Sequence, residues 1–179
     1  MATTVREPAS DADLAERASA GSADALAALY DRYAAGVHRL ARSLLRSTAE
    51  AEDVVQDVFV GLPRALRSYA GRGPLEAWIQ RVAARTALMR MRAERRRRED
   101  ALTPEAAPHA RGDSPVDRLA LERALAALPD ALRVVFVLKV VEGHSHESIA
   151  ELVGITPHSS RVRLFRARKL LQGLLSEDP

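Results

Sequence analysis

The sequence predicts an all-α protein made of two small helical units joined by a flexible linker. Three observations support this fold class. Apolar residues recur every three or four positions over residues 11–98 and again over residues 116–175, which is the period of a helix buried on one side. The intervening residues 99–115 contain three Pro, one Gly and several acids. The hydrophobic fraction of 47%, mostly Ala and Leu, suffices for packed cores.

The first unit, residues 11–98, is predicted to contain four helices, with breaks at residues 20–22, 47–48 and 71–74. The second helix covers residues 22–46 and the third covers residues 49–69. Their apolar stripes comprise Leu26, Leu29, Tyr33, Val37, Leu40, Leu44 and Leu45, and then Val54, Val55, Val58, Phe59, Leu62 and Leu66. The fourth helix begins at Pro74, because proline suits the first helical position, and ends in four arginines at positions 95–98.

The second unit is expected to form helices over residues 116–128, 130–141, 145–153 and 157–173, each started by a capping residue or a proline. The run Val-Val-Phe-Val-Leu at positions 134–138 is rich in residues that favour strands, so a buried strand is its alternative interpretation. No second strand is visible to pair with it. We therefore favour a helix.

Residues 145–171 have the pattern of a helix-turn-helix. Ser145 opens a short helix, Gly154 permits the left-handed turn, and Thr156 caps the next helix. The inner positions are Ile149, Ala150, Val153, Ile155, Leu164, Ala167 and Leu171. The outer face of the second helix contains no acid, which matches a helix lying in the major groove, with Val162 and Phe165 able to touch thymine methyl groups. The alternative is a solvated helix of an ordinary bundle.

Composition excludes several other functions. The absence of Cys removes disulfides, thiolate nucleophiles and Cys-based zinc sites. No apolar run reaches bilayer length and residues 1–10 do not resemble a signal peptide, so a cytoplasmic location is expected. His144, His146 and Glu147 do not form a metal site, because adjacent positions do not share a helix face and a third ligand is missing. Residues 71–73 lack the Lys-Ser/Thr of a nucleotide loop. No catalytic residue, metal or cofactor is therefore expected.

The charge instead indicates nucleic acid. The sequence pI is near 9.8, the positive side chains are almost all Arg, and their excess over the acids is concentrated in residues 1–98. The planar guanidinium group binds phosphate at two points, so clustered arginine is typical of a protein that contacts a nucleic-acid backbone.

The order of motifs resembles the extracytoplasmic-function (ECF) group of the sigma-70 family. The segments are AEDVVQDVFVGLPRAL (51–66), GRGPLEAWIQRVAARTALMRMRAERRRR (71–98), ALPDALRVVFVLKVVEGHSHESIAELVGI (127–155) and RVRLFRARKLL (161–171). The resemblance implies a region 2-like domain at residues 11–98 that binds core polymerase and the −10 element, a linker at 99–115, and a region 4-like domain at 116–175 that binds the −35 element. The implied function is promoter-specific transcription initiation with assistance in DNA opening.

The resemblance also implies residues for each surface. Polymerase docking is assigned to Asp53, Gln56, Asp57 and Phe59. Binding of the −10 element is assigned to Tyr69, Arg72, Trp78, Arg81, Arg85, Arg90 and Arg92. Binding of the −35 element is assigned to His158, Ser159, Arg161, Val162, Phe165, Arg166 and Lys169. The polar residues of the docking set could otherwise form a solvated helix face, and Trp78 could equally belong to the core.

Four positions depart from the pattern of the family. Arg85 and Met89 stand where most relatives have Asn and Asp, which affects the preferred −10 bases. Pro63 replaces a usual Trp and removes a backbone donor, so it can kink or end its helix. Ser160 replaces an inward Val, so the reading helix is expected to pack less firmly or to be rotated.

Two other classes of function compete with this interpretation. A stand-alone DNA-binding regulator would use the same reading helix but leaves residues 11–98 unexplained. A regulatory protein that binds a sigma factor or its antagonist would need the amphipathic faces but not the arginine-rich ends. An anti-sigma factor is a candidate further partner, because the group commonly has one.

The linker yields a prediction about spacing between promoter elements. Its 17 residues can extend to roughly 55–60 Å, whereas a coil of this length averages about 20–25 Å. A segment with this range cannot act as a ruler. Insertion of four Gly/Ser residues near Ala110 should therefore leave the optimal spacing unchanged, with at most reduced activity, in transcription assays on promoters that differ by single base pairs. A shifted optimum would show that the linker measures the distance, and complete loss would indicate a specific contact within residues 99–115.

Overall fold

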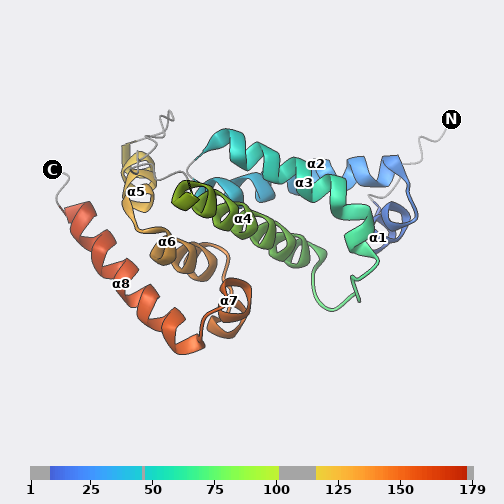
Figure 1. The fold of residues 1–179 in the computed structure, drawn as a ribbon. Helices are drawn as coiled ribbons and strands as arrows, with labels where there is room; N and C mark the ends of the chain where they lie inside the picture. Colours follow the sequence, from blue (N-terminus) through green and yellow to red (C-terminus); the bar gives the residue numbers. More distant parts are fainter. Residues whose placement is uncertain (1–8, 46, 101–115, 177–179) are drawn as a thin grey trace.

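All secondary structure described by the computed structural model is helical, which confirms the predicted fold class (Figure 1). The description covers residues 9–45, 47–100 and 116–176. The elements are α1 (Asp11–Ser19), α2 (Ala23–Leu44), α3 (Thr48–Leu66), α4 (Leu75–Asp100), α5 (Val116–Ala127), α6 (Asp130–Phe136), the π-helix η1 (Val137–Val141), α7 (His146–Val153) and α8 (Pro157–Ser176). Most of the predicted linker, residues 101–115, lies outside the described residues.

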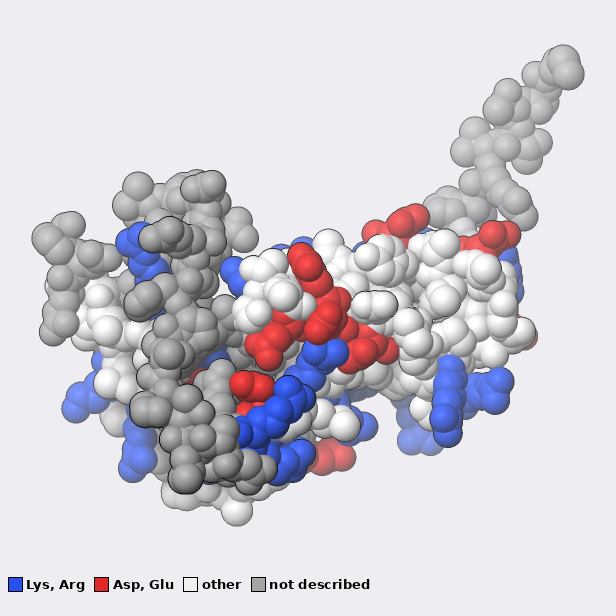
Figure 2. Space-filling model, turned by 45° about the horizontal axis from the view of Figure 1, so that its top comes forward, with Lys and Arg blue, Asp and Glu red and all other residues white. Residues whose placement is uncertain are grey.

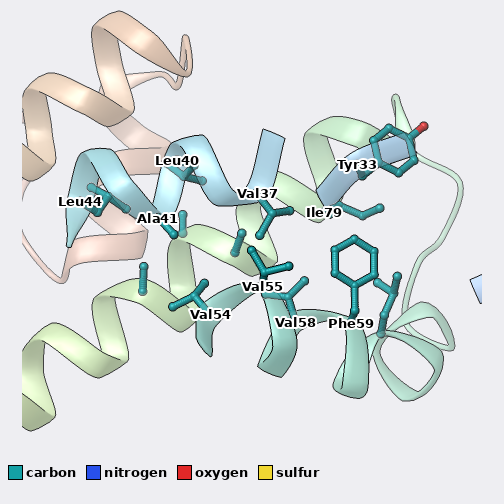
Figure 3. Packing of buried hydrophobic residues seen from close by; sticks show 14 of the residues in the cluster. Tyr33, Val37, Leu40, Ala41, Leu44, Val54, Val55, Val58, Phe59 and Ile79 are labelled. Atoms are coloured by element: carbon teal, nitrogen blue, oxygen red, sulfur yellow. The ribbon is translucent and has the colours of Figure 1, made fainter. Parts of the chain in front are cut away.

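The core of the N-terminal unit lies between α2, α3 and α4 (Figure 3). Its fully buried large side chains include Leu29, Val37, Leu40, Leu44, Val54, Leu62, Leu75 and Ile79. Each such side chain stabilises the fold by about 1.5–3 kcal/mol relative to exposure. Ala83, Ala84 and Ala87 of α4 are also completely buried, and their small size allows α4 to approach its neighbours closely. The sequence predicted these stripes because each helix buries one face.

A polar contact ties α1 to α2. The hydroxyl of Tyr33 donates a 2.6 Å hydrogen bond to Asp11, and the Arg32 guanidinium also binds this carboxylate. Burial, followed by the hydrogen bond to Asp11, raises the pKa of Tyr33 to about 12. Tyr33 therefore remains a neutral donor at physiological pH, and the first helix is held by a directional bond as well as by its buried Leu14 and Ala18.

Two helix ends differ from the predicted ones. The third helix, predicted to reach residue 69, ends at Leu66, and Pro63 lies within it and does not end it. The packed face of α3 holds the helix together despite the lost backbone donor. The fourth helix extends through Asp100, two residues into the segment predicted as linker, because the arginine-rich end still supports helix and places positive charge at a helix C-terminus.

The strand-prone run 134–138 is helical, as favoured from the sequence. Val134, Val135, Val137 and Leu138 are buried, so the apolar composition reflects burial on more than one side. The helix widens from α6 into the π-turn η1, which closes with a bond from the Glu142 amide to the Val137 carbonyl, 3.1 Å long. A π-turn shifts the register of the following residues, and here it leads into the loop before α7.

The two units pack against each other through reciprocal arginine contacts. Arg133 of α6 is only 3% exposed, and its Nη2 and Nε donate to the Leu44 carbonyl at the end of α2, at 2.8 and 3.3 Å. Arg92 of α4 donates in the opposite direction, to the carbonyls of Leu152 and Val153 at the end of α7, at 3.3 and 3.0 Å. Helix C-termini carry unpaired carbonyls and partial negative charge, so both contacts are favourable.

Arg133→Met should lower the free energy of unfolding by about 1–3 kcal/mol, because the buried Leu44 carbonyl loses its guanidinium donor while the volume is kept. Asp130, the ion-pair partner at 2.9 Å, is 63% exposed and can be solvated, so it adds little to the loss. Urea unfolding measures the change. Arg123→Met, at an exposed position on α5, is the matched control. Equal midpoints for the two variants would contradict the role of Arg133.

Candidate nucleic-acid interface

The predicted helix-turn-helix is formed by α7 and α8. The Ser145 hydroxyl accepts a 3.1 Å bond from the Ser148 amide and caps α7, and the Thr156 hydroxyl accepts a 3.0 Å bond from the Ser159 amide at the start of α8. Gly154 joins the helices with a φ of +76°, a conformation that disfavours residues with a Cβ. Local capping chemistry in the sequence thus determines where both helices begin.

The outer face of α8 is basic and open. Phe165 is 71% exposed, and His158, Arg161, Arg166 and Lys169 are also exposed. Ser159 and Val162 are partly buried at the edges of this face. The inner positions Leu164, Ala167 and Leu171 are buried, as predicted. Because no acidic residue occurs within α8, its outer face can approach a phosphate backbone without repulsion from its own side chains.

Arg161 has an intramolecular partner. Its Nη2 lies 3.1 Å from the Glu147 carboxylate of α7, and both side chains are more than half exposed. The pKa of Glu147 is lowered, mainly by hydrogen bonds with its own backbone amide and with Ser145, and to a smaller extent by Arg161. Exposed ion pairs of this kind are weak, so a phosphate can replace Glu147 as the partner of Arg161.

The loop before α4 contains the two predicted aromatic residues. The rings of Tyr69 and Trp78 lie 5.4 Å apart, and the Tyr69 hydroxyl donates a 2.8 Å bond to the Gly73 carbonyl. Gly73 itself has a φ of +85°. Trp78 is partly buried against the core, and its ring also lies beside Tyr69 of this loop. Its position therefore remains compatible with both a core role and a contact with the −10 element. Arg72 is exposed in the same loop.

Further along α4, Arg81 and Arg85 are exposed, as is Met89 at 62%. The loop after η1 lies near Arg81. Burial lowers the pKa of His144 there, and the positive charge of Arg81 lowers it further. Burial also raises the pKa of Glu142 in this loop, against the opposing effect of Arg39. The second unit thus lies close to part of the arginine-bearing surface of α4.

The structure brings together residues that the sequence assigned to different surfaces. Arg90, predicted to bind DNA, contacts the two acids predicted to bind polymerase: its Nη1 lies 2.9 Å from Asp53 and its Nη2 lies 2.7 Å from Asp57. Its Nε donates a further 3.2 Å bond to Asp57, and the pKa of Arg90 is raised, chiefly by that carboxylate. Arg92 is similarly engaged, by the end of α7. Figure 2 shows acidic side chains gathered on one face of the molecule with basic side chains directly beside them.

Among the predicted docking residues, Asp53, Gln56 and Asp57 are exposed, but Phe59 is only 5% exposed and belongs to the core. Phe59 faces inward because it shares a stripe with Val55 and Leu62 of α3, so it cannot provide an open contact in this conformation. Sequence reasoning missed Val60, which is 76% exposed beside the acids. It also missed Tyr30, 47% exposed, whose ring meets Phe59 edge-on at 4.9 Å. An apolar residue on the polar stripe of α3 is the signal that identifies Val60.

No three His, Asp or Glu side chains in the described parts of the chain come close enough to hold a metal ion. His146, considered for such a site, instead bonds to Ser160 through Nδ1 at 2.8 Å. Within the same described residues, no helix is long and apolar enough to cross a membrane.

Comparison with known proteins supports the arrangement of the two units. A profile described as Sigma-70 region 2 matches residues 29–97, and one described as Sigma-70, region 4 matches residues 118–171. The RNA polymerase sigma factor CarQ of Myxococcus xanthus is 33% identical over 167 residues, covering 90% of this chain and 95% of that protein. The ECF RNA polymerase sigma-E factor of Haemophilus influenzae is 31% identical over 183 residues, covering 93% and 95%. The chain is an ECF sigma factor of the sigma-70 family.

Two solved structures share its fold. The sigma factor RpoE, in a complex with the anti-sigma factor NepR from Bartonella quintana, aligns with a TM-score of 0.63 and 26% identity over 82% of this chain and 93% of that chain. CnrH, in a complex with the cytosolic domain of CnrY, aligns with a TM-score of 0.61 and 28% identity over 93% and 97%.

Membership defines the general function. This sigma factor binds core RNA polymerase and directs promoter-specific transcription initiation, and the family is not enzymatic. The match to region 2 explains the N-terminal unit, which a stand-alone regulator would leave without a purpose.

The pair between Arg161 and Glu147 generates a prediction for the helix-turn-helix. Glu147→Gln should strengthen binding to duplex DNA, because Arg161 no longer has a competing carboxylate. Arg161→Ala should weaken binding and flatten the slope of log K against log salt by up to about 0.9, the contribution of one phosphate contact. Fluorescence anisotropy over a salt series measures both effects. The gain from Glu147→Gln should vanish when Arg161 is also Ala, and its persistence would place Arg161 away from the DNA backbone.

Proposed function

We propose that the three surfaces divide the work of initiation: α3 docks on core polymerase, α4 with the preceding loop binds the −10 element, and α8 reads the −35 element. The pairing of Arg90 with Asp53 and Asp57 is the observation on which this proposal mainly rests. The pairing connects the docking helix α3 with the −10 helix α4. Because Asp53 and Asp57 are 56% and 52% exposed, another protein can reach these carboxylates and replace Arg90 as their partner.

The docking surface consists of Asp53, Gln56, Asp57 and Val60 on the outward side of α3. Asp53, Asp57 and Val60 follow one another at steps of four and three residues, and Gln56 lies three residues after Asp53 and four before Val60, so all four share one side of the helix. An exposed apolar residue among polar ones is typical of a contact site, where the apolar side chain is covered and the polar residues set the orientation. Phe59 supports this surface from behind by packing against Tyr30.

The −10 surface consists of the loop with Tyr69 and Arg72 and the exposed arginines Arg81 and Arg85 of α4. Aromatic rings stack on unpaired bases, and each stacked base contributes about 1–3 kcal/mol, so stronger binding to single strand than to duplex favours DNA opening without covalent chemistry. Arg90 and Arg92 join this surface only after they leave Asp53 and Asp57 and the end of α7. Arg85 and Met89 lie exposed where they can alter the preferred bases.

The −35 surface is the basic outer face of α8, with Arg161, Arg166 and Lys169 for phosphates and Val162 and Phe165 for base edges. A face with exposed Phe165 at its centre has the apolar contact that thymine methyl groups require. We place the action of the protein in the cytoplasm, where bacterial polymerase transcribes the chromosome.

An anti-sigma factor is a further expected partner. The solved sigma factor RpoE described above is in a complex with the anti-sigma factor NepR. In this chain the two units are already packed together, and Arg92 of α4, one of the arginines proposed to bind DNA, contacts the second unit. A protein that prefers this arrangement would withhold those arginines from DNA.

A pair of matched variants tests the docking assignment. The double variant Asp53→Asn, Asp57→Asn removes both carboxylates. Arg90→Gln breaks the same ion pairs but keeps both carboxylates. If the acids bind polymerase, the first variant should weaken association with core enzyme by about tenfold or more, and Arg90→Gln should leave it unchanged or tighter. Titration of labelled protein with core polymerase measures the affinity. Equal effects of both variants would show that the acids serve only Arg90.

A further inference from the structure

The helix-turn-helix contains a fully buried hydroxyl. Ser160 in the first turns of α8 has no exposed surface, and it lies on the same inner face as Leu164, Ala167 and Leu171. A buried hydroxyl without a hydrogen-bond partner is destabilising. The partner of Ser160 therefore decides whether a serine in place of the usual Val weakens the helix-turn-helix.

The partner of this hydroxyl comes from the other helix. The Ser160 Oγ lies 2.8 Å from Nδ1 of His146, the first residue of α7. The position of His146 is itself fixed, because Ser145 caps the same end of α7. The hydrogen bond therefore connects a rigid helix start to the reading helix.

The bond can fix an angle that apolar packing leaves open. Beside its two buried leucines, the inner face of α8 has two small residues, Ser160 and Ala167, at which no apolar side chain projects far enough to fix the angle by itself. Apolar burial is not directional, whereas a hydrogen bond requires both distance and angle. Arg161 follows Ser160 directly and Phe165 lies one turn beyond it, so a rotation of α8 would turn both away from their present directions.

A second contact between the helices cannot replace this bond during DNA binding. Arg161 and Glu147 also link α8 to α7, but both side chains are more than half exposed. A phosphate that binds Arg161 removes that link. The part-buried bond between His146 and Ser160 is then the polar connection that can keep the angle.

We propose that His146 is a positioning residue for promoter recognition, and that its hydrogen bond to buried Ser160 sets the rotation of α8 and hence which side chains face the bases. This inference rests on the proposed role of α8 as the reading helix. His146 does not touch DNA in this scheme. It acts through Ser160.

The charges around His146 make its contact with Ser160 sensitive to pH, because protonation places a positive ring beside Lys139 and Arg161. Burial lowers the pKa of His146 most, followed by the positive charges of Lys139 in η1 and Arg161 in α8. Glu147 in α7 raises the pKa, and Arg168 in α8 adds a smaller lowering effect. A histidine with a lowered pKa in the fold contributes stability that is complete above its ordinary value of 6.5 and is lost as the pH falls from there through the lowered value. The angle of α8 should therefore be less well held in acid.

The experiment uses the full chain and a duplex selected by it from a randomised library, compared with a scrambled duplex. The measured quantity is the ratio of the two affinities. Ser160→Val and His146→Phe should each lower this ratio by about tenfold, because one polar group loses its partner and α8 loses its fixed angle. The double variant should lower the ratio no further than either single variant, because each single variant already removes the same bond. Additive losses in the double variant would overturn the proposal.

A second arm separates positioning from folding. His146→Asn can still bond to Ser160 but does not titrate, so it should keep the ratio at about pH 7.5 and remove the decline that the unmodified chain shows towards about pH 5.5. His144→Asn, which changes the other titrating loop histidine, should leave that decline in place. An unmodified chain with no decline, or a decline that persists in His146→Asn, would contradict the inference.

The failure of the reading-helix assignment is distinguishable from the failure of this inference. Phe165→Ala and Arg166→Ala change the outer face directly. If neither alters the affinity ratio, α8 does not read the DNA and the proposed function of α8 is wrong. If they alter it but the His146 and Ser160 variants do not, only the positioning role is wrong. Thermal unfolding of each variant confirms that the helices remain formed.

Discussion

A buried guanidinium group lies at the junction of the two units, beside an apolar cluster to which both units contribute. Arg133 is removed from water by its burial, and such a charge is tolerated only when its donors find acceptors. Those acceptors are the Leu44 carbonyl at the end of α2, the Leu128 carbonyl and the Asp130 carboxylate. Because α6 carries Arg133 and leads through η1 into α7, this contact also determines where the helix-turn-helix lies relative to α4. Arg92 of α4 makes the reciprocal contact, with the Val153 carbonyl at the end of α7.

The acidic residues explain how so arginine-rich a chain has a formal net charge of only +3. Asp53 and Asp57 hold Arg90, and Glu147 holds Arg161, so arginines with proposed roles in DNA binding have exchangeable partners in the free protein. These pairs are exposed and weak, and phosphate competes with carboxylate for the same planar donor group. Binding is then an exchange of partners, in which the released acids become available to the positive groups of another protein. The compact chain avoids the self-repulsion that uncompensated arginines would cause.

The helices, their buried stripes and the helix-turn-helix were predictable because periodicity and capping are local properties. The contacts between units were not, since nothing near Arg133 or Arg92 in the sequence indicates which distant carbonyl each will bind. Phe59 was assigned both to the core stripe of α3 and to the docking surface, and only packing decides between them. Ser160 looked like a loss of packing when considered alone, because its partner His146 lies fourteen positions away on another helix. The sequence did not predict the π-turn, because a π-turn differs from an α-helix in its hydrogen-bond register and not in its composition.

The reciprocal arginine contacts have a consequence for affinity. A protein whose units must part before it engages DNA binds with its intrinsic affinity multiplied by the fraction of molecules that are open, so each 1.4 kcal/mol of closure weakens apparent binding about tenfold. The affinity of a ligand that binds the closed form is not reduced by this equilibrium. The buried guanidinium group of Arg133 lies outside every proposed promoter surface, so substitutions there would change the apparent affinity for DNA without altering a residue proposed to contact it.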